Sequence, residues 1–255
     1  MKVTFLGTGT SQGVPVIGCQ CEVCSSVDFH NNRLRSSILV EVEGVSLVID
    51  TGPDFRQQML RERVRRLDAV LFTHEHKDHT AGLDDIRSFN FLQRTDMPIY
   101  GRKRVLEQLK REFAYVFQEV KYPGVPRVLI NEITNKPFHI NGIEIIPIEV
   151  MHYKLPVFGF RIGDFTYITD ANYISEEEKE KIKGSKVLVL NALQKDAHIS
   201  HYTLHEAIEV MEELKPEKGY FTHISHKLGL HAEVTRELPE FIELAWDGLS
   251  VQIED

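Results

Sequence analysis

Cysteine is scarce in this sequence, and all of it lies in one short stretch. The 255 residues include three cysteines, Cys19, Cys21 and Cys24, and an odd number of clustered thiols is a poor disulfide framework. No apolar run approaches the roughly 18 residues that a membrane-spanning helix needs. The chain starts with a strand-like run at 3–6 rather than with a signal-peptide pattern. We therefore expect a cytoplasmic protein with no membrane partner.

An excess of positive charge is also absent. Lys and Arg number 30 against 38 Asp and Glu, which gives a formal net charge of -8. A nucleic-acid partner is disfavoured, because such proteins need a basic surface to bind the phosphate backbone. The hydrophobic fraction of 42% and the charged fraction of 27% are ordinary for a globular protein, and the length allows one large core. We predict a single domain over 1–255.

Strand-like and helix-like segments alternate along the chain. The two-residue turn signals Glu43-Gly44, Asn141-Gly142 and Gly163-Asp164 predict antiparallel hairpins. Helices are expected to cover the sheets from outside. The predicted strands are 3–6, 37–42, 45–50, 69–72, 143–149, 157–162, 165–168, 187–191 and 219–222, and the predicted helices are 55–64, 83–92, 104–117, 176–183, 204–214 and 232–242.

The segment 73–79, THEHKDH, directly follows the predicted strand at 69–72. Its residues His74, His76, Asp78 and His79 form the pattern His-x-His-x-Asp-His. Neutral imidazole and carboxylate groups suit zinc, iron or manganese, and this many donors at one strand end can supply much of a coordination sphere. The alternative is a polar, solvated loop. We interpret the segment as a metal-binding motif.

Three more potential ligands follow other predicted strands. His152 comes after 143–149, Asp170 after 165–168, and His223 after 219–222. Taken singly, each histidine is more often a hydrogen-bonded structural residue, and Asp170 is an equally good helix N-cap. Together, downstream of the histidine cluster, they predict a metal site assembled at one edge of the sheets.

The three cysteines provide three of the four ligands of a structural zinc site, because closed zinc sites are four-coordinate and often Cys3His. This places a zinc-binding loop near 18–25. Three histidines are candidates for the fourth ligand: His30, His226 and His231. The alternative is a loop with three reduced thiols.

A capping box is predicted at the start of the helix 204–214. Thr203 as the N-cap and Glu206 three residues later can satisfy each other's backbone donors. His201 then lies in the loop just before the helix, where its ring can reach a site, whereas His205 lies within the first helical turns. The alternative for His201 is a surface histidine.

With these motifs the chain resembles the metallo-β-lactamase superfamily, whose ordered motifs match 74–79, His152, Asp170 and His223. The resemblance extends over essentially the whole chain. The resemblance implies an α/β (α+β) fold, a four-layer αββα sandwich, with two divalent metals, zinc or manganese with iron as an alternative. Asp170 and a water or hydroxide would bridge the metals. The dizinc β-lactamases carry cysteine at that place, so antibiotic hydrolysis is disfavoured. The implied ligand sets are His74, His76 and His152 on one metal and Asp78, His79 and His223 on the other.

Three stretches are similar to the PhnP-like cyclic phosphodiesterases in particular: LGTGTSQGVP at 6–15, GCQCEVC at 18–24 and THISH at 222–226. This closer resemblance implies that His226 is the fourth ligand of one structural zinc. It also implies that His201 acts on the leaving group. Relatives of this kind are often dimers, which leaves a homodimer open.

The resemblance implies hydrolysis of a small cyclic phosphate, such as a phosphoribosyl 1,2-cyclic phosphate, with Asp78 and His201 at the reacting centre. Such a diester is anionic, so we expect cations near its oxygens and place Arg87 and Lys154 there. An exposed ion pair is the alternative for each. The segment 89–122 carries no motif that identifies its role.

Three alternatives stay open. A tRNase Z-like endoribonuclease shares the His-x-His-x-Asp-His motif, but the acidic charge and the absence of a long basic insertion disfavour RNA. A thioester or lactone hydrolase could use the same metals, because a metal-activated hydroxide also attacks carbonyls. A non-catalytic binding protein on the same fold is disfavoured, because no metal ligand is missing.

Overall fold

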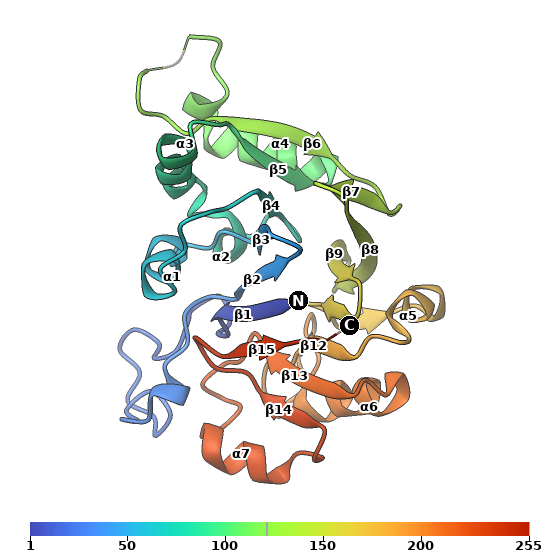
Figure 1. Ribbon diagram of the computed structural model, residues 1–255. Coiled ribbons are helices and arrows are strands. Elements are labelled where there is room, and N and C mark those ends of the chain that lie inside the picture. Colours follow the sequence, from blue (N-terminus) through green and yellow to red (C-terminus); the bar gives the residue numbers. More distant parts are fainter. Residues whose placement is uncertain (121, 255) are drawn as a thin grey trace.

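Two β-sheets pack face to face in the computed structural model, which describes residues 1–120 and 122–254. Figure 1 shows helices on the outer side of each sheet, and the two chain termini close together. The Met1 ammonium donates a hydrogen bond to the Ile253 carbonyl at 2.9 Å, which ties the two ends of the chain. The predicted four-layer αββα sandwich is confirmed.

The first sheet has the strand order β15-β1-β2-β3-β4-β5-β6, and the second has β11-β8-β9-β10-β12-β13-β14 with β7 paired to β8. The first sheet is built from β1 (Lys2–Gly7), β2 (Ser37–Val42), β3 (Val45–Ile49), β4 (Ala69–Leu71), β5 (Met97–Gly101), β6 (Val128–Glu132) and β15 (Ser250–Gln252). The second is built from β7 (Phe138–Ile140), β8 (Ile143–His152), β9 (Leu155–Ile162), β10 (Phe165–Tyr167), β11 (Tyr173–Ile174), β12 (Val187–Asn191), β13 (Lys218–Thr222) and β14 (Ile242–Leu244).

All three predicted hairpin turns connect antiparallel neighbours: β2 to β3, β7 to β8 and β9 to β10. Glu43 and Asn141 both take a positive φ of 49°, as two-residue hairpin turns require. The neighbours β3-β4-β5-β6 and β10-β12-β13-β14 are parallel. The carboxyl ends of these parallel strands therefore meet at one edge of the sandwich.

The helices lie where the sequence places most of them, with shorter bounds. They are α1 (Phe55–Arg61), α2 (Lys77–Thr80), α3 (Arg87–Gln93), α4 (Lys103–Glu112), α5 (Glu176–Ile182), α6 (Leu204–Leu214) and α7 (His231–Glu237). Among the described residues, none of the helices is both long and apolar enough to cross a membrane.

Three of the helix predictions were wrong in part. The helix predicted at 83–92 begins as a 3₁₀ turn, η2 (Leu83–Ile86), before α3. The helix predicted at 104–117 ends at Glu112 and is followed by a separate 3₁₀ turn. The helix predicted at 232–242 stops at Glu237, because Leu238 precedes Pro239 and takes an extended conformation. Ile242 belongs instead to β14.

Three apolar clusters explain the layers. Val3 and Phe5 of β1 and Phe158 and Phe160 of β9 meet between the two sheets. On the outer faces, α1 packs through Phe55 against the first sheet, and α6 packs against the second. Alternation of side chains along each strand allows a sheet to contribute to the inner and the outer cluster at once.

Candidate metal centre

The structure brings together all of the metal ligands predicted at strand ends. One group contains His74, His76, His152 and Asp170, a second contains Asp78, His79, Asp170 and His223, and within each group the potential ligand atoms lie within 4.8 Å of one another. Asp170 belongs to both groups. The carboxylate of a single residue is therefore placed where it can bridge two cations, as the resemblance implies.

Several of the strands that supply this site end in a strained backbone conformation. Asp170 after β10, His223 after β13 and Tyr153 after β8 have φ values of 59°, 55° and 58°. Left-handed backbone is rare for residues other than glycine, and such strain gathers at functional sites. Here it turns the chain sharply at the sheet edge, so that successive strands present their next side chain to the same point.

Hydrogen bonds fix the orientation of the ligand rings. His152 Nδ1 donates to the Ser200 carbonyl at 2.9 Å, and His79 Nδ1 lies 2.7 Å from Asp50 Oδ2. Each bond leaves Nε2 as the free ring nitrogen, which is the usual arrangement of a metal-binding histidine. In the part of the chain that the structure describes, the buried Nε2 atoms of His79 and His223 have no hydrogen-bond partner.

Asp50 is a site residue that the sequence analysis missed. It is fully buried, takes a φ of 66°, and accepts hydrogen bonds from the Thr73 backbone nitrogen at 2.9 Å and the Thr73 hydroxyl at 2.7 Å. With its bond to His79, it orients both ends of the His-x-His-x-Asp-His segment. The signal was present, because Asp50 follows an apolar strand just as Asp170 does.

Charge in the site is arranged for cations. Burial opposes ionisation of Asp170, but the nearby imidazoles of His223 and His79 outweigh it and hold the pKa of Asp170 well below its usual range. Asp78 behaves in the same way beside His79 and His223, and its pKa is also lowered. Two carboxylates that stay ionised beside several imidazoles form a donor set suited to divalent metal. The residues present therefore fit the metals that the fold implies.

The cysteine cluster forms a second, separate group with His226. The sulfurs of Cys19, Cys21 and Cys24 lie 3.3, 3.4 and 3.4 Å from His226 Nδ1. Ideal tetrahedral zinc with Zn–S near 2.3 Å and Zn–N near 2.0 Å would place sulfur and nitrogen about 3.5 Å apart. The Cys24 backbone N–H and His226 lower the pKa of Cys21 to about 6, which favours the thiolate that zinc needs.

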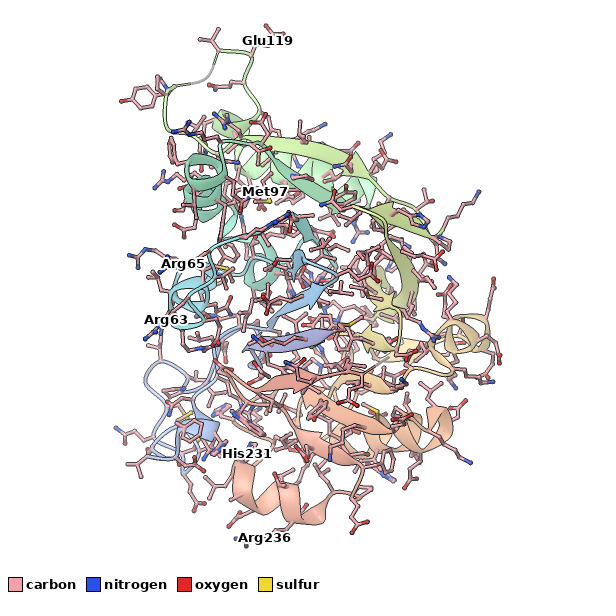
Figure 2. The ribbon with its side chains drawn as sticks, in the orientation of Figure 1. Arg63, Arg65, Met97, Glu119, His231 and Arg236 are labelled. Carbon is pink, nitrogen blue, oxygen red and sulfur yellow. The ribbon has the colours of Figure 1, made fainter. Side chains whose placement is uncertain are left out.

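The other two histidine candidates for this site have different partners. His30 Nδ1 pairs with Asp28 at 2.6 Å, and His231 Nδ1 lies 3.1 Å from a guanidinium nitrogen of Arg33. The two rings stack 4.7 Å apart. Figure 2 shows His231 at the start of α7, beside the N-terminal loop, and its backbone nitrogen donates to Asn31 at 2.8 Å. His30 and His231 therefore anchor the N-terminal loop and do not join the three cysteines as the fourth zinc ligand.

We predict that Cys21→Ser removes one metal equivalent and lowers the thermal midpoint of unfolding, because a closed site adds its metal-binding free energy to the folded state. Metal content by plasma mass spectrometry and a thermal melt measure the two effects. Ser26→Ala, in the same loop, is the matched control and should keep the metal. Unchanged metal content in Cys21→Ser would contradict the zinc assignment.

His201 lies against both ligand groups. Its ring centroid is 4.6 Å from that of His152 and 4.8 Å from that of His223. The predicted capping box of Thr203 and Glu206 is present at the start of α6, so His201 precedes the helix as expected. It is buried rather than at the surface, and burial lowers its pKa to about 3.

A cavity of about 500 Å³ opens beside His76 and His152, and Lys154 lines it. Arg87, the other cation predicted near substrate, is not among the residues that line this cavity. Its guanidinium pairs with Asp84 at 3.1 Å on a half-exposed surface. The structure thus brings Lys154 to the metal ligands, whereas the role of Arg87 stays a prediction.

Comparison with known proteins adds three findings. The family model of the β-lactamase superfamily domain matches residues 46–224. A crystal structure described as a new diphosphatase from the PhnP family is 40% identical, has a TM-score of 0.93, and aligns over 99% of this chain and 98% of that one. The ribonuclease Z of Staphylococcus epidermidis is 28% identical over 170 residues, which are 64% of this chain and 49% of that protein.

A protein of Porphyromonas gingivalis named octanoyltransferase is 38% identical over 258 residues, covering 100% of this chain and 52% of that protein. The chain therefore spans about half the length of the curated relatives that it matches. The similarity to the diphosphatase, in contrast, extends over nearly the whole of both chains.

Proposed function

This chain belongs to the metallo-β-lactamase superfamily and is PhnP-like within it, and from that membership we propose that it is a metal-dependent phosphodiesterase that opens a small cyclic phosphate. A phosphoribosyl 1,2-cyclic phosphate is the kind of substrate that we propose. The observation that carries the proposal is the position of His201, a buried imidazole in contact with one histidine from each ligand group.

The two ligand groups would hold two divalent cations, zinc or manganese, through His74, His76 and His152 and through Asp78, His79 and His223, with Asp170 between them. Bound there, the cations would acidify a water molecule and neutralise phosphate charge. Asp50 keeps the His79 ring in place, and the Ser200 carbonyl keeps that of His152. The chain's own contribution is thus a rigid and largely buried donor set.

His201 supplies what a cyclic phosphate requires and a thioester does not. The oxygen that leaves when the ring opens is a sugar alkoxide of high pKa, so it needs a proton as the P–O bond breaks. Burial keeps His201 neutral in the free protein. A phosphate anion in contact with the ring would raise its pKa and allow it to bind and then donate that proton.

A second candidate substrate is a linear diphosphate. The neighbour that aligns with the whole chain is described as a diphosphatase, and the cavity beside His76 and His152 provides room for a substrate that extends beyond one phosphate. The same site would serve for both substrates. In a phosphodiester and in a diphosphate diester alike, the attacked phosphorus carries two oxygens that link it to other groups.

Octanoyl transfer is the third possibility to test, because of the name of the Porphyromonas gingivalis relative. Nearly half of that protein has no counterpart in this chain, and we propose that the transfer belongs to that unmatched part. The described thiols of this chain all lie in the group with His226, so they are not placed to carry an acyl group at the metal site.

Hydrolysis of a substrate panel tests the proposal. We expect the metal-loaded protein to open ribose 1,2-cyclic phosphates and to hydrolyse bis(p-nitrophenyl) phosphate, with loss of activity on chelation and recovery on adding zinc or manganese. The panel also contains 2',3'-cyclic nucleotides, a precursor tRNA, an octanoyl thioester and a lactone. Hydrolysis of the thioester or lactone without any phosphodiester would contradict the proposal, as would cleavage of the tRNA alone.

A further inference from the structure

The cavity beside the metal ligands has a chemical character of its own. It is lined by His76 and His152 from the metal site, by Ser200, and by the larger side chains of Arg104, Tyr153, Lys154, Leu155 and Ile199. Among the described residues that line it, two are cationic and none is acidic. The lining therefore favours an anion, through its two cations, together with an apolar or planar group, through Tyr153 and Ile199.

The Lys154 ammonium is available to bind an anion. Its ammonium lies 5.2 Å from the centre of the Tyr153 ring, and the described carboxylates make no ion pair with it. A lysine that lines a cavity, lies over a ring face and has no acidic partner among the described residues can bind an anion in that cavity. The Tyr153 and Ile199 side chains beside it are 48% and 66% exposed, so the apolar part of the cavity is also uncovered.

Arg104, in contrast, is held in position by an ion pair with a residue of the metal-binding motif. Its guanidinium pairs with Glu75 at 2.6 Å, and Glu75 stands between the ligands His74 and His76. At the other end of α4, Glu112 pairs with Lys77 at 2.7 Å. The two residues of the His-x-His-x-Asp-His motif that are not ligands thus bind both ends of the helix.

These contacts explain what the segment 89–122 contributes in its described part. Helix α4 lies along β5 and β6 in Figure 1, and the ion pair of Arg104 with Glu75 joins its first turn to the metal motif. One carboxylate oxygen of Glu75 cannot satisfy all five N–H donors of a guanidinium. Arg104 therefore keeps donors for a second anion while its position is fixed.

We propose that this cavity binds the second phosphate and the nucleoside of a linear dinucleoside diphosphate. The inference rests on the proposed function, since it assumes that a phosphorus atom of the same substrate sits at the metal ligands. Lys154 and Arg104 bind the phosphate that is not attacked. Tyr153 stacks on the base beyond it, and Ile199 covers the other side of that base.

The reaction balances without a further reactant. Water adds through its oxygen to one phosphorus, and the bond from that phosphorus to the bridging oxygen breaks. Two nucleoside monophosphates form, and the two protons of the water stay on the products or, above the second phosphate pKa of about 6, pass to solvent. The departing group is a phosphate of low pKa, so it leaves without a proton, and Lys154 and Arg104 bind its charge in the substrate as well as in the product. Lys154 and Arg104 are therefore specificity-determining residues for this substrate class, whereas His201 serves an alkoxide.

The test uses P1,P2-di(adenosine-5') diphosphate as substrate and AMP as the binding probe. For Lys154→Ala we expect a KM about tenfold higher with a smaller change in kcat, and AMP binding about tenfold weaker by calorimetry, since one charge-assisted contact is lost. Lys154→Arg should restore most of the AMP affinity. Lys110→Ala, an exposed lysine on α4, is the control and should match the wild type.

Two outcomes overturn the inference and leave the proposed function standing. One is a wild-type protein that opens ribose cyclic phosphates but neither cleaves the diphosphate nor binds AMP. The other is a Lys154→Ala protein with wild-type KM and AMP affinity. A wild-type protein that hydrolyses no phosphodiester and no diphosphate overturns the proposed function as well, so the two failures are distinguishable.

Discussion

Replacing Asp170 with alanine should lower kcat by at least about 10³-fold, because a carboxylate shared by the two ligand groups is removed and both cations lose anionic compensation. The fold should survive. Asp170 is one of several buried polar groups at a sheet edge, while the apolar clusters that hold the layers do not include it. Steady-state hydrolysis of bis(p-nitrophenyl) phosphate and circular dichroism measure the two effects.

The control for this variant is Asp164→Ala, in the hairpin turn between β9 and β10, which should keep wild-type activity. Measuring the metal content of Asp170→Ala shows whether its activity falls together with a loss of metal. We expect Asp170→Ala to keep the metal bound by the cysteines and to lose metal from the histidine groups. An Asp170→Ala protein with full metal content and near-normal turnover would contradict a bridging role.

His201→Ala should lose about 10²-fold or more in kcat on a cyclic phosphate with a sugar leaving group, as expected when a general acid is removed. The loss should be far smaller with a p-nitrophenyl ester, because p-nitrophenolate departs without a proton. Metal content should stay at the wild-type level, since His201 belongs to neither ligand group.

His205→Ala provides the matched comparison. His205 lies four residues later on α6, and its side chain is 83% exposed. Its removal should therefore leave kcat unchanged on both the cyclic phosphate and the p-nitrophenyl ester. Equal losses on both substrates in His201→Ala would point to a role in binding phosphate or in holding the site together. The proton donor would then have to be another group.

The metal site could be predicted because its signals are local. Each ligand lies at the end of an apolar strand or in the short segment that follows it, and the ends of neighbouring strands meet at one edge of a sheet. The segment 73–79 carries its donors within a few residues, so no long-range contact is needed to recognise it. Asp50 has the same signal after β3, but it binds a ligand histidine rather than a metal, and a single aspartate at a strand end does not reveal this.

The first sheet beyond β4 could not be predicted in the same way. Strand β5 contains Pro98 near its start, which weakens a strand prediction. In β6, Leu129 and Ile130 are neighbours and are 52% and 37% exposed, so the strand shows no alternation of buried and exposed residues. Their pairing comes from the parallel neighbours on either side of β5, which are distant in sequence.

The ion pairs of α4 were also outside the reach of sequence patterns. Glu75 and Arg104 are 29 positions apart, and nothing in either segment indicates the other. Substrate recognition depends on such contacts, because the cavity residues come from different loops and strands. For this reason the sequence indicates the chemistry of the metal site more clearly than it indicates the substrate.

The most direct test of the account is hydrolysis of a ribose 1,2-cyclic phosphate in ¹⁸O-labelled water, with mass spectrometry of the ring-opened product. If water attacks phosphorus, one labelled oxygen appears in the phosphate group and the sugar oxygens stay unlabelled. Label on the sugar would mean that a C–O bond breaks instead. A phosphate without label, or no ring opening by the metal-loaded protein, would contradict the proposed hydrolysis.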